Sequence, residues 1–222
     1  MKKIHQHFKI GRNEFNPLNN RQKEYLSTIQ QKTITFGIGP AGTGKTFCAI
    51  LSGVDEILKR EKKKIIFIRP IIECGRGIGF LKGSVEEKIQ PFFVPLHENL
   101  KKIVGPERYA ALIKKRLVLD MPIEHVRGLT FNDSYIILDE GQNATSHQIK
   151  TVLTRIGNNS KLIINGDDEQ SDIGKKSGLI FAKEALQGMH QLGVVTFTED
   201  DIVRSSLIKN ILIRWRKKEM NL

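Results

Sequence analysis

One short segment, GIGPAGTGKTFCAI (37–50), constrains the fold more than any other part of the chain. The β-rich run TITFGI (33–38) leads into three closely spaced glycines, and a segment with helical apolar spacing follows them. Glycine allows backbone conformations and close approaches that a Cβ atom would block. The segment therefore predicts a strand, a tightly wrapped loop and a helix, in that order.

Further apolar runs predict a sheet of parallel strands. KKIIFIR (63–69) is apolar throughout its centre, which is typical of a strand buried on both faces. YIILDE (135–140), KLIING (161–166) and VVTFT (194–198) repeat this pattern, and segments with helical periodicity separate them. Because strands alternate with helices, we expect an α/β fold with a mostly parallel sheet flanked by helices.

The chain has 222 residues, and we expect it to form one domain, 1–222. Residues 1–15 are expected to be an N-terminal extension. Residues 70–130 have a less regular pattern, which predicts one or two helices and loops inserted between core strands. The last periodic segment predicts a helix that buries Leu207, Ile208, Ile211, Leu212 and Trp215.

The glycine-rich loop matches the Walker A pattern, G-x4-G-K-[ST]. Its glycines let several backbone N–H groups point at one phosphate chain, and the positive end of the following helix adds to the attraction. Lys45 can reach the β- and γ-phosphates, and the Thr46 hydroxyl can bind Mg²⁺. The loop therefore predicts a nucleotide site formed by Gly39, Pro40, Ala41, Gly42, Thr43, Gly44, Lys45 and Thr46.

Two acids end the strand in SYIILDEGQN. Asp139 and Glu140 lie at the carboxyl end of a predicted parallel strand, where open α/β sheets bind ligands. We expect Asp139 to hold Mg²⁺ through water, and Glu140 to orient and deprotonate an attacking water. The next strand ends in INGDDEQSD (164–172), where Asp167 and Gln170 are candidates for contact with the γ-phosphate.

Several motifs together resemble the PhoH-like family of P-loop ATPases, which is related to superfamily 1 helicases. They include GPAGTGKT, RPIIECGRGIGFLKGSVEEKIQPFFVPL, VRGLTFNDSYIILDEGQN and GDDEQSD, and the resemblance extends from residue 16 to residue 215. It implies a RecA-like core, binding of ATP and Mg²⁺, and ATP hydrolysis. It also suggests coupling to RNA or single-stranded DNA.

By motif position, the resemblance gives the same roles to the loop lysine and threonine and to the two strand-end acids, and it makes Gln170 the γ-phosphate sensor. Gln22, in NPLNNRQKEYL, resembles the helicase glutamine that reads adenine. Its alternative is a capping-box partner of Asn19. The family usually has an acid where this chain has Arg76, so the role of that acid is in doubt or falls to Glu73.

A superfamily 1 helicase places ATP between two RecA-like domains, and an arginine reaches the nucleotide from across the cleft. This chain has residues for one such domain, so we expect a neighbouring subunit to supply the arginine, which is worth about 10³ to 10⁵ in rate. A head-to-tail contact that closes gives a ring, and we expect a hexamer. The candidates, each of which could instead be an ordinary surface arginine, are Arg127, Arg155 and Arg204.

The net charge of +12 favours an anionic partner. We expect RNA or single-stranded DNA to bind through its phosphates, with steep salt dependence and little sequence preference. Aromatic residues for base stacking are sparse, at 7%. Candidate contacts, which could also be solvated helix faces, are Arg69, Arg76, Lys82, Lys101, Lys102, Lys114, Lys115 and Arg116.

No run approaches the roughly 18 apolar residues that span a bilayer, and the start of the chain lacks a signal-peptide pattern. We therefore expect a cytoplasmic protein. Cys48 and Cys74 form no metal-spaced cluster and predict reduced thiols.

Two other functional classes stay open. One is a nucleotide-switched binding protein with slow hydrolysis, although the acid pair argues against it because a switch needs no positioned base. The other is a small-molecule P-loop kinase. Thymidine kinases of that kind carry zinc-spaced cysteines, which this chain lacks, and segment 71–95 is unlike a nucleoside lid.

Overall fold

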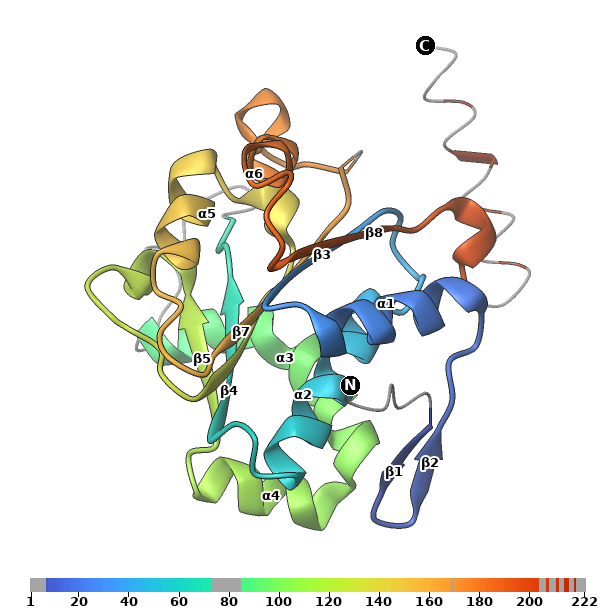
Figure 1. The fold of residues 1–222 in the computed structure, drawn as a ribbon, viewed down its shortest axis with the longest axis vertical. Coiled ribbons are helices and arrows are strands. Elements are labelled where there is room, and N and C mark those ends of the chain that lie inside the picture. Colours follow the sequence, from blue (N-terminus) through green and yellow to red (C-terminus); the bar gives the residue numbers. More distant parts are fainter. Residues whose placement is uncertain are drawn as a thin grey trace.

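The structure, a computed structural model, describes residues 7–72, 85–168 and 170–203, and the single positions 207, 211, 214, 215 and 218. Within these residues, six strands form one sheet in which every pair is parallel. The predicted α/β fold with a mostly parallel sheet is confirmed (Figure 1). Across the sheet the strands follow the order β5 (Val118–Pro122), β4 (Lys64–Arg69), β6 (Ser134–Leu138), β7 (Lys161–Gly166), β3 (Ile34–Ile38) and β8 (Leu192–Thr196).

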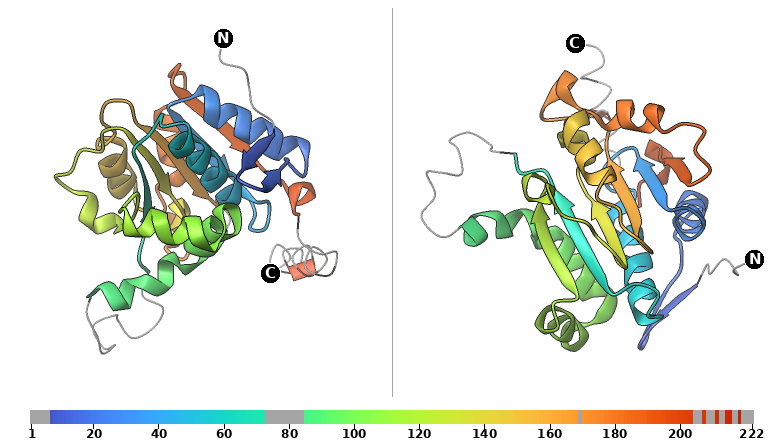
Figure 2. Two further views of the ribbon diagram at one scale, coloured as in Figure 1. Left: turned by 90° about the horizontal axis from the view of Figure 1, so that it is seen from below. Right: turned by 60° about the vertical axis from the view of Figure 1, so that its left-hand side comes forward.

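Helices cover both faces of this sheet (Figure 2). One face packs against α1 (Asn20–Gln31), α2 (Lys45–Leu58) and α3 (Val85–Val104), and α4 (Pro106–Lys114) packs on α3. The other face holds η2 (Ile123–Val126), α5 (Ser146–Leu153) and α6 (Leu179–Ala185). Short 3-10 turns are η3 (Gly141–Asn143), η4 (Gly174–Lys176) and η5 (Glu199–Asp201). None of the described helices has the length and apolar character needed to cross a bilayer.

The two cores explain why the strand sequences are apolar at consecutive positions. In β4, Ile65 and Phe67 point into the core beneath α2 and α3, whereas Ile66 and Ile68 point into the core beneath α5. All four side chains are fully buried. Burial on both faces removes the polar alternation that marks a strand with one solvated face.

The structure adds strands where the sequence predicted none. Residues 118–122 lie in the region interpreted as helices and loops, but they form the edge strand β5. Asp120 interrupts the apolar run of this strand. Its carboxylate is not left without a partner, since it pairs with His97 of α3 at 2.7 Å between Oδ2 and Nε2. Within the predicted extension, β1 (Phe8–Ile10) and β2 (Asn13–Phe15) form a hairpin that buries Phe8 and Ile10 in the first core.

The prediction that the C-terminal helix buries its apolar side chains is wrong for the three described positions in this chain taken alone, while Ile208 and Leu212 lie outside the described residues. The exposed fractions are 66% for Leu207, 48% for Ile211 and 69% for Trp215. These described positions are helical, as their spacing predicts. Apolar periodicity indicates which face of a helix is apolar, but it does not say what that face packs against.

Helix α2 approaches β6 closely at Gly53. A Cβ atom at this position would lie 2.7 Å from Cδ1 of the Tyr135 ring, which is fully buried. Glycine in a helix interior usually costs stability relative to alanine. Here it provides the space in which the ring of Tyr135 packs between helix and sheet.

We expect Gly53→Ala to destabilise the fold by about 1–3 kcal/mol, because the new methyl group overlaps the Tyr135 ring. At an unobstructed position the same change stabilises by about 0.4–1 kcal/mol. Denaturant unfolding measures the difference, and Tyr135→Leu provides the control background. In that background the cost should disappear, so an equal cost with and without the ring would contradict the explanation.

Candidate nucleotide-binding site

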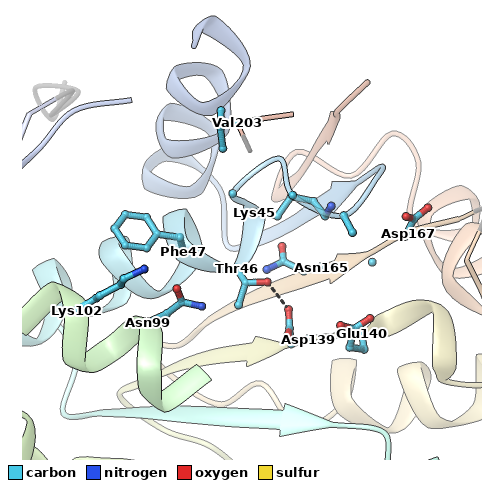
Figure 3. A pocket seen from close by; sticks show the side chains of 14 residues that line it. Lys45, Thr46, Phe47, Asn99, Lys102, Asp139, Glu140, Asn165, Asp167 and Val203 are labelled. Atoms are coloured by element: carbon cyan, nitrogen blue, oxygen red, sulfur yellow. Dashed lines mark hydrogen bonds between the residues drawn. The ribbon is translucent and has the colours of Figure 1, made fainter. Parts of the chain in front are cut away.

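The motif residues meet at the carboxyl edge of the central strands. The loop 39–46 follows β3, Asp139 and Glu140 follow β6, and Asp167 follows β7. Because β7 lies between β3 and β6, these three strand ends are adjacent. A cavity of about 500 Å³ opens at this edge, and residues of all three segments line it (Figure 3).

The loop has the wrapped backbone that the sequence predicts. Gly39, Gly42 and Gly44 have φ angles of 134°, 85° and 86°, a region that favours glycine. At Gly39 a Cβ atom would also overlap the backbone carbonyl of Phe197. Helix α2 begins directly after Gly44, at Lys45, so its N-terminal N–H groups face the same cavity as the loop.

Lys45 is buried against its own loop. Its Nζ donates hydrogen bonds to the carbonyl oxygens of Gly39 and Pro40, at 2.6 and 2.8 Å. Burial lowers the pKa of the ammonium group, while the nearby carboxylates, Asp167 foremost, oppose this shift. A phosphate in the cavity would favour the charged form further, because an opposite charge at short range stabilises it.

Thr46 and Asp139 form the closest link between the loop and β6. The Thr46 hydroxyl donates to Oδ1 of Asp139 at 2.8 Å (Figure 3). Burial raises the pKa of Asp139 and Glu140 adds to the effect, while Arg69 and Thr46 oppose it. A hydroxyl and a carboxylate are hard oxygen ligands, and Mg²⁺ in nucleotide sites takes one or two such groups together with phosphate oxygens and water. The pair therefore fits a magnesium ion.

Glu140 is held in a strained backbone conformation with both carboxylate oxygens engaged. Its φ of 55° lies in the left-handed region, which is uncommon for residues other than glycine. Arg69 pairs with Oε1 at 2.8 Å and Gln142 donates to Oε2 at 2.6 Å. The side chain is 40% exposed and lines the cavity. Such strain collects at functional positions, where the surrounding structure maintains it.

Arg69 differs from its predicted role as a nucleic-acid contact. Its side chain is 15% exposed, and it donates to the carbonyl of Phe92 as well as pairing with Glu140. The reason is that β4 lies next to β6, which brings the two strand ends together. Its guanidinium is therefore committed to the protein interior.

Two side chains of α3 form a wall of the cavity that the motifs do not predict. Asn99 and Lys102 both line it, on the side where Phe47 lies (Figure 3). Their spacing of three residues places them on one face of a helix, which is the only sequence signal for the pair. Lys102 was expected as a nucleic-acid contact; it is exposed, and it also lines this cavity.

Further polar residues missed by the sequence analysis lie at the strand ends. Asn165 of β7 is buried and lines the cavity. Its Oδ1 accepts a hydrogen bond from the Tyr25 hydroxyl, while Nδ2 has no hydrogen-bond partner among the described residues. Gln142 lies in the turn after Glu140. A glutamine two residues after the acid pair is visible in the sequence, but its partners depend on the fold.

Gln22 lies next to the loop without lining the cavity. Its Nε2 donates to the carbonyl of Thr43 at 2.9 Å, and its Oε1 accepts from the backbone N–H of Leu18 at 2.9 Å. Asn19 caps α1 by accepting from the backbone N–H of Gln22 at 2.8 Å. The cap is present, but the reciprocal bond of a capping box is replaced by the contact with Leu18.

Of the two candidates after β7, only Asp167 lines the cavity. Gln170 is exposed, and its backbone N–H donates to the carbonyl of Asp167 at 3.3 Å. This position gives no support to a direct contact between the Gln170 amide and the nucleotide. The structure instead brings Asp167 and Asn165 to the end of β7.

Two of the candidate arginines, Arg127 and Arg155, do not line the cavity of their own chain. Arg155 donates to the carbonyl of Leu129 at 3.3 Å, and Leu129 precedes β6, so Arg155 lies at the opposite edge of the sheet. Arg127 lies beside His147, with Nη2 and Nε2 3.5 Å apart. Arg204, like Arg76, Lys82 and Glu73, is outside the described residues.

A parallel sheet with a Walker A loop after β3 and paired acids after β6 defines a P-loop NTPase domain. The family model described as "PhoH-like protein" matches residues 14–215. A PhoH-like protein of Bacillus subtilis (strain 168) is 40% identical over 199 residues, covering 89% of this chain and 62% of the relative. Protein PhoH of Escherichia coli (strain K12) is 35% identical over 198 residues, covering 87% and 56%. The chain belongs to the PhoH-like family, and it spans roughly three fifths of these relatives.

Solved structures with a similar arrangement are more distant in sequence. The UvsW helicase from bacteriophage T4 is 13% identical with a TM-score of 0.47, covering 87% of this chain and 64% of that one. The N-terminal domain of the DNA packaging ATPase from bacteriophage phi29 is 14% identical with a TM-score of 0.46, covering 86% and 98%.

We expect Lys102→Ala to weaken nucleotide binding about three- to fivefold, since one solvent-accessible cation contributes at most about 1 kcal/mol. Lys101→Ala is the matched control, because it removes the same charge from the neighbouring exposed position of α3, which does not line the cavity. Calorimetric titration with ADP and ATP measures both. Equal losses of affinity in the two variants would show that nucleotide binding depends on the overall positive charge and not on the position of Lys102.

Proposed function

We propose that this chain is a Mg²⁺-dependent ATPase whose hydrolysis is coupled to RNA or single-stranded DNA in a homo-oligomeric ring. One observation carries the proposal of hydrolysis: the phosphate-binding loop, the Thr46–Asp139 pair and Glu140 converge on a single cavity. Membership in the PhoH-like family supports the same reading. The chain covers 62% and 56% of the two relatives compared. The proposal is therefore made for the residues of this chain and not for the whole length of those relatives.

The loop would bind the triphosphate through its backbone N–H groups, and Lys45 would exchange its loop carbonyls for the β- and γ-phosphates. Thr46 and Asp139 would hold Mg²⁺, which when bound neutralises charge on the phosphate oxygens. Gln22 contacts Thr43 of the loop, and from its resemblance to the helicase glutamine we propose that it faces the adenine. This arrangement assigns phosphate binding to the loop between β3 and α2, and it leaves activation of the attacking water to Glu140 after β6.

Glu140 is proposed as the general base. It is an accessible carboxylate at the cavity, and its position is fixed by two neighbours. A base of this kind contributes about 10² to 10⁴ in rate by removing a proton from the attacking water. At the end of β7, Asp167 is better placed than Gln170 to respond to the γ-phosphate, because it lines the cavity.

We expect Lys45→Ala to abolish nucleotide binding. Glu140→Gln should keep binding and lose about 10²- to 10⁴-fold in turnover, because the amide retains the shape of the carboxylate but not its basicity. Phosphate release, measured with and without single-stranded RNA and DNA, distinguishes a hydrolase from a nucleotide switch or a small-molecule kinase. Wild-type turnover in Glu140→Gln would contradict the assignment of the base.

Nucleic-acid binding is proposed from the net charge of +12 and from the exposed cations of α3 and α4. Arg69 is engaged within the protein. Lys102 is exposed at the edge of the cavity, and the other described candidates, Lys101, Lys114, Lys115 and Arg116, are exposed as well. Contacts of this kind are to phosphates, so the affinity should fall steeply with salt. Stimulation of phosphate release by a polynucleotide would therefore weaken as salt rises.

A ring is proposed because the arginine needed at the γ-phosphate would come from another copy. Arg155 lies at the edge of the sheet opposite to its own cavity, so any action on a nucleotide requires a neighbouring subunit. A head-to-tail contact joins unlike surfaces and closes into a ring when its rotation allows. A hexamer is the assembly we favour.

Mixing two inactive variants tests this arrangement. In rings of Arg155→Ala and Glu140→Gln subunits, the first would contribute an intact base and the second an intact arginine, so activity should reappear above that of either variant alone. Arg127→Ala and Arg204→Ala serve as parallel tests of the other candidates. Native mass spectrometry gives the assembly state, and a fully active monomer would rule out the ring.

A further inference from the structure

Gln142 joins the ends of β6 and β7 through its side-chain amide. The residue is 4% exposed, and Nε2 donates to Oε2 of Glu140 at 2.6 Å. On the other side of the amide, Oε1 accepts from the backbone N–H of Asp167 at 3.0 Å. The backbone carbonyl of Gln142 also accepts from the Ser171 hydroxyl at 2.9 Å. One buried side chain therefore connects two residues that line the nucleotide cavity.

These partners permit only one orientation of the Gln142 amide. In the reversed orientation, the amide oxygen would face the carboxylate of Glu140 and the NH₂ group would face the N–H of Asp167. Both contacts would be repulsive, and a buried polar group without a partner costs about 1–3 kcal/mol. Gln142 thus presents a fixed donor to Glu140, and the backbone at the end of β7 fixes that donor in turn.

Arg69 holds the carboxylate from the opposite side. It pairs with Oε1 at 2.8 Å, whereas Gln142 occupies Oε2. A carboxylate offers about four lone-pair sites, so roughly two stay available for water. A general base must lie within hydrogen-bond reach of its proton, and a misplacement of about 1 Å can cost about 10²-fold in rate. The direction of the free lone pairs therefore depends on both neighbours.

We infer that Gln142 is a positioning residue for Glu140, which fixes the plane of the carboxylate relative to the end of β7. An amide suits this role because it supplies one donor and one acceptor in a rigid plane. A methionine of similar length would fill the space without either group. The inference rests on the proposed role of Glu140 as the general base.

The neighbouring residue provides a matched comparison. Asn143 also joins η3 to the segment after β7, since its Nδ2 donates to Oδ2 of Asp172 and its Oδ1 accepts from the Asp172 backbone N–H, both at 2.9 Å. The two amides thus bridge the same pair of segments with the same chemistry. Of these two amides, Gln142 is the one that contacts the carboxylate of Glu140.

The experiment compares Gln142→Met with Asn143→Leu in the full chain. We expect Gln142→Met to lower kcat about tenfold to hundredfold. The Kd for ATP should stay within about twofold, because the phosphate-binding loop is untouched. Asn143→Leu should leave both constants within about twofold. Equal losses of kcat in the two variants, or wild-type kcat in Gln142→Met, would overturn the inference, and unfolding curves of both show that each variant folds.

A double variant separates the inference from the proposed function. If Gln142 acts through Glu140, Gln142→Met should cause no further loss of kcat in a Glu140→Gln background. A full additional loss there would overturn the positioning role. If Glu140→Gln alone keeps wild-type turnover, the proposed base is wrong whatever Gln142→Met does. If Glu140→Gln loses turnover and Gln142→Met keeps wild-type kcat, only the inference about Gln142 fails.

Discussion

The parallel pairing of β7 with both β3 and β6 brings the phosphate-binding loop, the two acids and Asp167 together. Parallel strands end at one edge, so the loop after β3, the acids after β6 and Asp167 after β7 reach the same cavity. A slip of one residue would turn every side chain of a strand into the opposite core, where it would not match the existing packing. The two apolar cores therefore hold together a site in which most of the side chains are polar.

The cavity concentrates charged groups where burial disfavours charge. Burial lowers the pKa of Lys45 and raises the pKa of Asp139, so each group is displaced toward its neutral form. Their mutual attraction and the Thr46 hydrogen bond oppose these shifts. Phosphates and a divalent cation would each supply the missing opposite charge, because they stabilise the ammonium and the carboxylate respectively. Binding of phosphate and of a divalent cation would therefore stabilise the charged forms of Lys45 and Asp139.

The sequence could predict the parts of the site whose chemistry is local. The glycines, Lys45 and Thr46 lie within one segment of eight residues, so their pattern in the sequence is sufficient to predict the shape of the loop. Asn99, Lys102 and Gln142 act through contacts that only the packed fold creates, and Arg69 was assigned elsewhere for the same reason. Strand β5 was missed because Asp120, which pairs with His97, breaks its apolar pattern. An edge strand such as β5 is less completely buried than a central strand, so its sequence has a weaker apolar pattern.

The left-handed backbone at Glu140 has a consequence for how this chain can change over time. Glycine or asparagine would adopt that conformation at lower cost, so glutamate is among the less stable choices at this position. Random substitution accompanied only by pressure to stay folded would tend to remove the glutamate. A related chain that retained glutamate here, in this geometry, would be one in which selection for function had outweighed selection for stability.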